Sequence, residues 1–108
     1  MSYKVFTIPP FDRQLKRLSG KYPSLKKEIA ELFHSLEKNP DQGQAIGDSY
    51  YKIRLAIASK GKGKSGGARV ITYFIVSAKS VYLLSIYDKS ERATISDSEL
   101  ESLLKFLR

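Results

Sequence analysis

The fold is decided by residues 50–87, which read YYKIRLAIASKGKGKSGGARVITYFIVSAKSVYLLSIY. This stretch holds three runs rich in β-branched and aromatic residues, Tyr50–Ala58, Arg69–Val76 and Val81–Tyr87. Such runs are typical of β-strands. The link from Ser77 to Ser80 has the length of a hairpin connection. We therefore expect three consecutive strands that pair mainly antiparallel.

The sequence before these strands predicts a short strand and two helices. A strand is expected over Tyr3–Ile8, ended by Pro9-Pro10, and an amphipathic helix over Phe11–Ser19, with Gly20 placed to stop it. Pro23 suits the first turn of a second helix, which Asn39-Pro40 ends. Its apolar face is formed by Leu25, Ile29, Leu32, Phe33 and Leu36. The short connection predicts an antiparallel helical hairpin.

The remaining segments complete the predicted order of elements. Asp41–Ser49 is polar with two glycines and is expected to be a loop. Ser96 and Glu99 form a capping box ahead of a C-terminal helix whose apolar stripe is Leu100, Leu103, Leu104 and Leu107. The order is β-α-α-β-β-β-α. It predicts an α+β fold in which the helical hairpin packs on a small, mainly antiparallel sheet.

Length and composition limit the class of protein. The chain has 108 residues and 42% hydrophobic residues, so we expect one domain spanning residues 1–108 with a core of its own. It has no cysteine, which excludes disulfides and thiolate metal sites. We see neither a signal peptide nor an apolar run long enough for a membrane span. A cytoplasmic protein with no membrane association is expected.

The glycine-lysine loop SKGKGKSGGARV, residues 59–70, invites comparison with a phosphate-binding P-loop. The P-loop motif G-x-x-x-x-G-K-[ST] would need a glycine at the position of Ala58. A P-loop also opens a helix that receives the phosphate, whereas a strand pattern follows this loop. Both observations argue against a nucleotide-binding P-loop.

Positive charge is concentrated in one segment. The formal net charge is +8, and no Asp or Glu occurs between Ser49 and Tyr87. That segment carries +7, from Lys52, Arg54, Lys60, Lys62, Lys64, Arg69 and Lys79. Soluble surfaces usually intersperse both signs, so the pattern favours a binding surface for a polyanion over an ordinary solvated face.

Strand geometry groups four of the basic residues. Side chains alternate between the faces of a strand, so Tyr51, Ile53, Leu55 and Ile57 are expected to face the core. Lys52 and Arg54 then share the other face, about 7 Å apart at a rise of ~3.3 Å per residue. If the first two runs pair antiparallel, Arg69 lies near the end of the first. With Lys89, which follows the last strand, these residues are expected to converge on one concave face.

The residue types present favour one form of RNA chemistry. His34 is the only histidine, and we interpret it as a surface or boundary residue, since one histidine cannot supply an acid–base pair. No cluster of histidines or acids suggests a metal site, and no cofactor is expected. An RNA 2′-hydroxyl can attack its adjacent phosphate while cations stabilise the transition state. A lysine can serve as base if neighbouring positive charge lowers its pKa.

Three motifs in this order resemble the RelE/ParE superfamily of bacterial toxins. They are Tyr51-Lys52-Ile53-Arg54-Leu55, Gly66-Gly67-Ala68-Arg69-Val70-Ile71, and Leu84-Ser85-Ile86-Tyr87-Asp88-Lys89-Ser90-Glu91. The lysine-glycine loop is similar to the HigB-like branch. The resemblance runs from about Tyr3 to Leu104.

The resemblance implies a small α+β ribonuclease toxin of a type II toxin–antitoxin system. Such a toxin enters the ribosomal A site, cleaves mRNA there without a metal, and is blocked by a cognate antitoxin. The carried-over site is Lys52 as candidate general base, Arg54 and Arg69 as phosphate and transition-state stabilisers, and Lys89 as candidate acid or phosphate clamp. We expect more firmly that these four residues form the site than that each has the role named for it.

One departure from the family pattern concerns an aromatic residue. RelE-type toxins place a tyrosine after the last strand, where this chain has Arg92-Ala93-Thr94-Ile95. Tyr87 or Tyr73 is a candidate replacement, because base stacking needs only an aromatic face. Packing in the sheet is the competing interpretation and the favoured one for Tyr73. We place Tyr87 with the catalytic set and Tyr73 with RNA binding.

The loop lysines are predicted to bind ribosomal RNA rather than to do chemistry. Lys60, Lys62 and Lys64 alternate with glycines as mobile cations, and phosphate contacts position a protein without reading sequence. They are expected to affect affinity and its salt dependence. Two alternatives to the nuclease stay open. One is a ParE-like inhibitor of DNA gyrase that cuts nothing. The other is a catalytically weak RNA-binding member, which the missing tyrosine leaves open.

Overall fold

The strands form one mixed sheet. We describe the protein from a computed structural model, which covers residues 2–61 and 63–107. The strand order is β1-β5-β4-β3-β2, with β1 parallel to β5 and the other neighbours antiparallel. The bounds are Lys4–Thr7 for β1, Gln44–Gly47 for β2, Tyr50–Leu55 for β3, Ala68–Ile75 for β4 and Ser80–Asp88 for β5.

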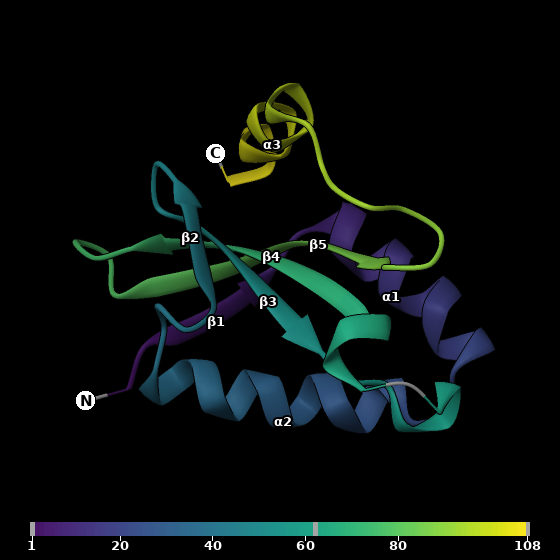
Figure 1. Ribbon diagram of the computed structural model, residues 1–108. Coiled ribbons are helices and arrows are strands. Elements are labelled where there is room, and N and C mark those ends of the chain that lie inside the picture. Colours follow the sequence, from purple (N-terminus) through teal and green to yellow (C-terminus); the bar gives the residue numbers. More distant parts are fainter. Residues whose placement is uncertain (1, 62, 108) are drawn as a thin grey trace.

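Helices cover the sheet from opposite sides. α1 (Pro9–Lys21) and α2 (Leu25–Lys38) form the N-terminal hairpin, while α3 (Asp97–Leu103), followed by the short turn Leu104–Leu107, lies across the sheet from α2 (Figure 1). The predicted α+β fold, with a helical hairpin on a mainly antiparallel sheet, is confirmed. None of the helices in the described part of the chain is long and apolar enough to cross a membrane.

The end of α1 differs from the prediction. Gly20 does not stop the helix, which continues to Lys21. Tyr22 ends it instead: its backbone N–H donates to Leu18 O, and its buried side chain donates a hydrogen bond to Asp88. A tertiary contact here overrides the weak helix preference of glycine. The helix also begins earlier than expected, at Pro9. A proline is tolerated in the first turn because the backbone N–H that it lacks would have no partner within the helix there.

The predicted loop Asp41–Ser49 contains a strand. β2 pairs with the start of β3, with Gln44 opposite Lys52 and Ala45 opposite Tyr51. Its four residues, QAIG, have no strong strand preference, so β3 acts as the template that gives them one. β3 itself ends at Leu55 rather than Ala58, because Ala58 begins a short 3₁₀ turn, η1 (Ala58–Lys60), whose first N–H donates to the Glu28 carboxylate.

Strand register separates the two faces of the sheet. The row Ile53–Val70–Ile86 is buried, and these residues belong to the core formed with Leu18, Leu25, Ile29, Leu32 and Leu36 from the helical hairpin. The adjacent row is Arg54–Arg69–Tyr87. Because side chains alternate along each strand, this row faces the side away from the hairpin. That outer face carries the basic residues.

α1 protects the part of β5 that β1 does not reach. β1 pairs with Ser80–Leu83 only. Beyond that point the side chain of Gln14 in α1 accepts hydrogen bonds from Ile86 N at 2.9 Å and Ser85 Oγ at 3.1 Å. An uncovered strand edge would be free to pair with another chain. The helix therefore completes the sheet where the first strand is too short.

α3 begins at the predicted cap residue Ser96, where one half of the expected capping box, the hydrogen bond from Glu99 N to the Ser96 hydroxyl, is formed. The Ser96 hydroxyl accepts from Glu99 N at 3.2 Å and donates to the Glu99 carboxylate at 3.4 Å. Leu100 is buried, and its carbonyl accepts from the Tyr50 hydroxyl at 3.5 Å. The cap and this contact fix α3 over one end of the outer face.

Candidate functional site

A basic hollow of about 470 Å³ occupies the other end of the outer face. We call it the basic pocket. It is lined by Gln42, Gly43, Gln44, Lys52, Ile53, Arg54, Lys64, Arg69, Lys89 and Ala93. No described residue in this lining is acidic. Its volume lies within the range of sites that hold small ligands, so one nucleotide of a longer chain would fit.

The structure brings together the four basic residues that the sequence singled out. Lys52 and Arg54 project from β3, and Arg69 stands opposite Arg54 in the register with β4. Lys89 follows β5, and its backbone N–H donates to Gly67 O at 3.0 Å, which fixes the turn beside the start of β4. Four cations from three strands and their ends therefore meet in one hollow, as strand alternation predicts.

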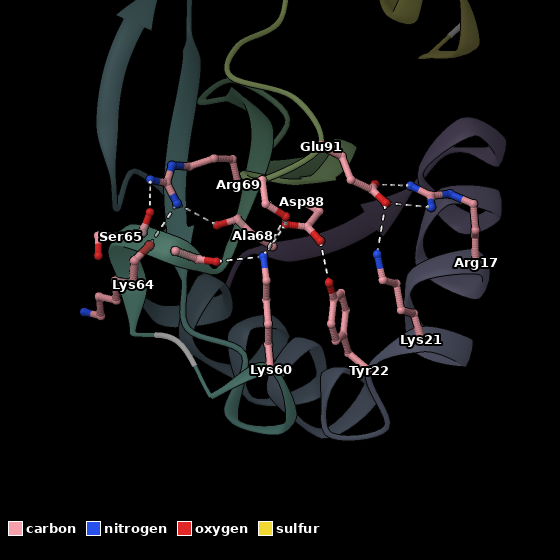
Figure 2. A network of polar contacts seen from close by, with 12 residues as sticks. Arg17, Lys21, Tyr22, Lys60, Lys64, Ser65, Ala68, Arg69, Asp88 and Glu91 are labelled. Atoms are coloured by element: carbon pink, nitrogen blue, oxygen red, sulfur yellow. Dashed lines mark hydrogen bonds and ion pairs between the residues drawn. The ribbon is translucent and has the colours of Figure 1, made fainter.

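Arg69 is held more tightly than its neighbours. It is 6% exposed. Its Nη1 donates to Lys64 O at 2.9 Å and Ala68 O at 3.2 Å, and Nη2 donates to Ser65 O at 3.2 Å (Figure 2). A guanidinium has five N–H donors, so these contacts within the described residues leave two for an anion. The side chain is oriented before any ligand arrives.

Two glycines let the walls of the pocket approach closely. A Cβ on Gly43, whose φ is +97°, would lie 2.6 Å from Lys52 O, and one on Gly67 would lie 2.1 Å from Leu55 O. Neither distance is possible for a real side chain. The segment before β2 can therefore lie against β3, and the start of β4 against its end, only because these positions lack a Cβ.

Tyr87 lies beside Arg69 in the strand register but is not among the residues that line the pocket. It is 5% exposed and its hydroxyl is buried without a hydrogen-bond partner among the described residues. Burial raises its pKa, although Arg69 and Arg92 act in the opposite direction. The Arg92 guanidinium lies 5.5 Å from the ring centroid, a distance typical of a cation–π contact. Because the ring is buried and one side of it is contacted by Arg92, Tyr87 offers no open face for a base in this arrangement.

The glycine-lysine loop is more ordered than the sequence suggests. Lys60 was expected to be a mobile cation for RNA, but its side chain is only 12% exposed and forms an ion pair with Asp88 at 2.5 Å. The physical reason is that a carboxylate buried away from water is costly unless a cation is paired with it, so Lys60 contacts Asp88 instead of extending into solvent. Lys64 is exposed and lines the pocket. Lys62 lies outside the described residues.

Tyr73 and His34 lie away from the basic pocket. Tyr73 packs against Tyr50, with ring centroids 5.2 Å apart, and lines a second hollow with Leu100 and Leu104 of the C-terminal segment. The packing interpretation of Tyr73 thus has structural support. His34 is 85% exposed on α2, with Nδ1 3.6 Å from Glu37 Oε1, and the expected surface position is confirmed.

An exposed ion-pair group holds the turn after β5 against α1. Glu91 accepts from Arg17 at 2.8 Å and from Lys21 at 3.3 Å (Figure 2). The hydrogen bond from Arg17 is the main reason that the pKa of Glu91 is lowered. Exposed pairs of this kind contribute little to stability. Their role here is to restrain the segment that carries Lys89.

Sequence reasoning missed one wall of the pocket. Gln42, Gly43 and Gln44 line it, and the side chain of Gln42 is fixed by donating to Ser35 Oγ at 2.8 Å and Asn39 O at 3.1 Å. The only signal in the sequence was the glycine, which marks a close approach or a turn. The wall depends on the pairing of β2 with β3, which is a tertiary event.

Comparisons with known proteins identify the family and support the fold. The family model described as "RelE toxin of RelE / RelB toxin-antitoxin system" matches residues 3–107. The fold is similar to that of a double mutant of the E. coli toxin RelE in the free state, with 18% identity, a TM-score of 0.54, and 97% of each chain covered. It is also similar to the isolated E. coli RelE toxin, with 20% identity, a TM-score of 0.53, and 96% and 98% of the two chains covered.

A third similar structure contains an antitoxin. It is the toxin–antitoxin complex RelBE2 from Mycobacterium tuberculosis, with 17% identity, a TM-score of 0.56, and 87% of this chain and 95% of that chain covered. At these identities the structural matches support the fold, while the family match carries the assignment.

Proposed function

The chain belongs to the RelE family of toxins from type II toxin–antitoxin systems, and from that premise we propose that it is a ribosome-dependent endoribonuclease that cleaves mRNA in the A site. The observation that carries this proposal is the basic pocket, in which Lys52, Arg54, Arg69 and Lys89 converge without a described acidic residue in the lining. A site with this charge suits the crowded negative charge of a phosphoryl transition state.

The proposed reaction uses the 2′-hydroxyl of the RNA as nucleophile. Its oxygen bonds to the adjacent phosphorus, the bond from phosphorus to the 5′-oxygen breaks, and the products are a 2′,3′-cyclic phosphate and a 5′-hydroxyl. Neutral Lys52 takes the proton from the 2′-hydroxyl, and protonated Lys89 gives one to the leaving 5′-oxygen. Arg54 and Arg69 bind the non-bridging oxygens, where guanidinium groups form bidentate contacts.

Lys64 has a different role in this proposal. It is exposed at the rim of the pocket, where a long cation reaches phosphates without being fixed against the chain. Such contacts raise affinity in a salt-dependent way. We assign Lys64 to ribosomal or messenger RNA binding and not to the chemical step.

A cognate antitoxin is the second proposed partner. The M. tuberculosis structure is a toxin–antitoxin complex, and another similar structure, at 21% identity and a TM-score of 0.51, holds an E. coli RelE mutant with a peptide of the antitoxin RelB. We propose that this chain is likewise blocked by a protein encoded beside it. A toxin that acts on ribosomes would act in the cytoplasm.

Induction in bacteria with mapping of mRNA 5′ ends tests the nuclease. Codon-phased new ends in translated regions are expected for the wild type. The Arg54→Met variant should lose them, while Arg13→Met, which removes an exposed arginine of α1, should keep them. Arg54 is a cleaner target than Arg69, because Arg69→Ala also removes the three hydrogen bonds that hold the loop.

Other outcomes of this experiment identify the alternatives. DNA breakage with intact mRNA would indicate a gyrase inhibitor and overturn the nuclease. Absence of any growth defect would indicate a catalytically weak RNA-binding member, an outcome that the buried position of Tyr87 makes physically reasonable.

A further inference from the structure

Lys60 uses all of its hydrogen-bonding capacity inside the protein. Its ammonium group donates to Asp88 Oδ1 at 2.5 Å, Gly66 O at 2.9 Å and Ser90 Oγ at 3.0 Å. An ammonium has three donors, so each has a partner. Figure 2 shows the side chain rising from the loop to Asp88 beside Tyr22. This lysine therefore has no donor left for an RNA phosphate.

Asp88 is the buried centre of this cluster. It has no exposed surface, and besides Lys60 its carboxylate accepts from Tyr22 OH at 2.6 Å, Ser90 N at 2.9 Å and Ser90 Oγ at 2.8 Å. Burial alone would raise the pKa of Asp88, but hydrogen bonds from Lys60, Tyr22 and Ser90 outweigh it and hold that pKa well below its usual range. Asp88 is therefore ionised, and the ion pair with Lys60 compensates its buried charge.

The contact with Gly66 connects Lys60 to Arg69. Gly66 ends the short 3₁₀ turn η2 (Lys64–Gly66). The two carbonyls before it, Lys64 O and Ser65 O, accept the hydrogen bonds from the Arg69 guanidinium. Lys60 fixes the third carbonyl of the turn, and Arg69 rests on the first two. The orientation of Arg69 consequently depends on the same turn that Lys60 anchors.

We propose that Lys60 and Asp88 are positioning residues for Arg69, acting through the turn Lys64–Gly66. The proposal rests on the function proposed above, in which Arg69 binds the reacting phosphate. A loop this rich in glycine would otherwise sample many conformations. A cation aimed at a transition state acts best when it needs no reorganisation. The ion pair supplies that order from outside the pocket.

The two ends of the loop are anchored independently of Lys60. At its start, Ser59 N donates to Ser24 Oγ at 2.9 Å and Ala58 N donates to Glu28 Oε2 at 2.7 Å. At its end, Gly67 O accepts from Lys89 N at 3.0 Å. Removing the Lys60 side chain therefore frees the middle of the loop while its ends stay in place. We expect the variant to fold.

Lys60→Met and Lys64→Met form a matched pair for a kinetic test. Each removes one positive charge from the same loop. In single-turnover cleavage of mRNA on programmed ribosomes, Lys60→Met should lower the rate at saturation by about tenfold or more, with affinity and its salt slope unchanged. Lys64→Met should weaken affinity and reduce the salt slope by roughly 0.7–0.9, the loss of one phosphate contact. A reduced salt slope with an unchanged saturated rate for Lys60→Met would overturn the proposal.

A spectroscopic measurement tests the positioning without any catalysis. The Nε–Hε cross-peak of Arg69 in a ¹⁵N correlation spectrum reports the surroundings of its guanidinium. Lys60→Met should shift or broaden this cross-peak, and Lys64→Met, which keeps the backbone carbonyl, should leave it in place. An unchanged Arg69 cross-peak in Lys60→Met would overturn the proposal even if the wild type cleaves RNA. A wild type that cuts nothing would instead overturn the proposed function, and the spectrum would still decide the positioning.

A double variant keeps the test valid if Lys60→Met does not fold. Lys60→Met leaves a buried carboxylate without its cation, whereas Lys60→Met with Asp88→Asn removes both charges. We expect the double variant to be more stable than Lys60→Met alone but to show the same displaced Arg69 cross-peak. A double variant with a wild-type cross-peak would show that the pair does not orient Arg69.

Discussion

The outer face of the sheet has two ends made from the same strands. At one end, β3 and β4 contribute Lys52, Arg54 and Arg69 to the basic pocket. At the other, they contribute Tyr50 and Tyr73, which pack with α3 and the turn after it. We call this second region the aromatic end. One end is open and charged, and the other is closed by a helix.

The difference shows how one face of a small sheet can provide both a packing surface and an open binding site. The strand periodicity places all these side chains on one face. At the aromatic end, α3 and the turn after it remove apolar area of Tyr50 and Tyr73 from water. The basic end has nothing to gain from a cover, because burying unpaired cations costs free energy. It stays open, and its side chains are held by the turn Lys64–Gly66, which accepts hydrogen bonds from Arg69 and which Lys60 links to Asp88.

The largest expected effect concerns the candidate general base. Lys52→Met should lower the cleavage rate by roughly 10²–10⁴-fold, as loss of a positioned proton acceptor does, and should leave the free energy of unfolding within about 0.5 kcal/mol. Its control is Lys105→Met, an exposed lysine in the turn after α3, which should keep the rate. Equal losses of cleavage rate in the two variants would mean that the rate depends on the net charge of the protein and not on a lysine in the pocket. Single-turnover kinetics decide this.

A truncation at the aromatic end should have the opposite profile. Leu100→Ala removes a buried side chain of α3, so the free energy of unfolding should fall by roughly 2–5 kcal/mol. Cleavage by the folded protein should stay within twofold of the wild type, because Leu100 does not line the basic pocket and takes no part in the ion pair between Arg92 and Glu99 that links α3 to the side of Tyr87. Urea unfolding and kinetics below the transition give both values. A tenfold loss of rate would show that the ends are coupled.

The buried ion pair should give the stability a pH dependence at low pH. The pKa of Asp88 is lowered in the folded protein from an ordinary value of 3.8. Its stabilising effect is therefore complete above about pH 4 and is lost as the pH falls toward the folded pKa. Asp88→Asn lacks this component, so the difference in the free energy of unfolding between wild type and variant should shrink below pH 3.8. Urea unfolding at pH values from 7 to 2.5 measures this difference. A difference that stays constant over that range would contradict the lowered pKa of Asp88.

The smallest expected effect tests the cap of α3. Ser96→Ala removes the hydroxyl that accepts from Glu99 N, and the free energy of unfolding should fall by about 1 kcal/mol. Ser98→Ala, two residues further on, is the matched control: its hydroxyl lies 3.3 Å from that of Ser96 but is not the one that accepts from Glu99 N, so its loss should change the free energy of unfolding by less. Thermal unfolding followed by circular dichroism measures both. A larger loss for Ser98 would place the cap elsewhere.

Local patterns were sufficient where one segment decides its own structure. The second helix follows from Leu25, Ile29, Leu32 and Leu36, all of which are buried, and the hydroxyl of Ser96 caps the third helix as expected. The alternation in β3 separated Ile53 from Lys52 and Arg54. Antiparallel pairing then placed Arg69 opposite Arg54. These outcomes depend on periodicity and on adjacent strands, which a sequence displays directly.

Local patterns failed where distant segments decide. Gly20 lies inside α1 because the next turn is held by Tyr22 and Asp88. β2 exists because β3 offers it a partner. Lys60 looked the same as Lys64 in the sequence, since both stand between glycine-rich neighbours. Only the position of Asp88 at the end of β5 makes one of them internal and leaves the other at the surface.

The sequence by itself determined the α+β class, the order of the elements apart from β2, the strand faces and the four cations that meet in the pocket, because side-chain periodicity and short connections act locally. The tertiary structure alone decided which cation is exposed, which is paired, and what holds Arg69 in place. The physical reason is that burial of a charge depends on partners far away in the chain. The Lys60–Asp88 pair, which joins a loop to the end of a strand, is the clearest case.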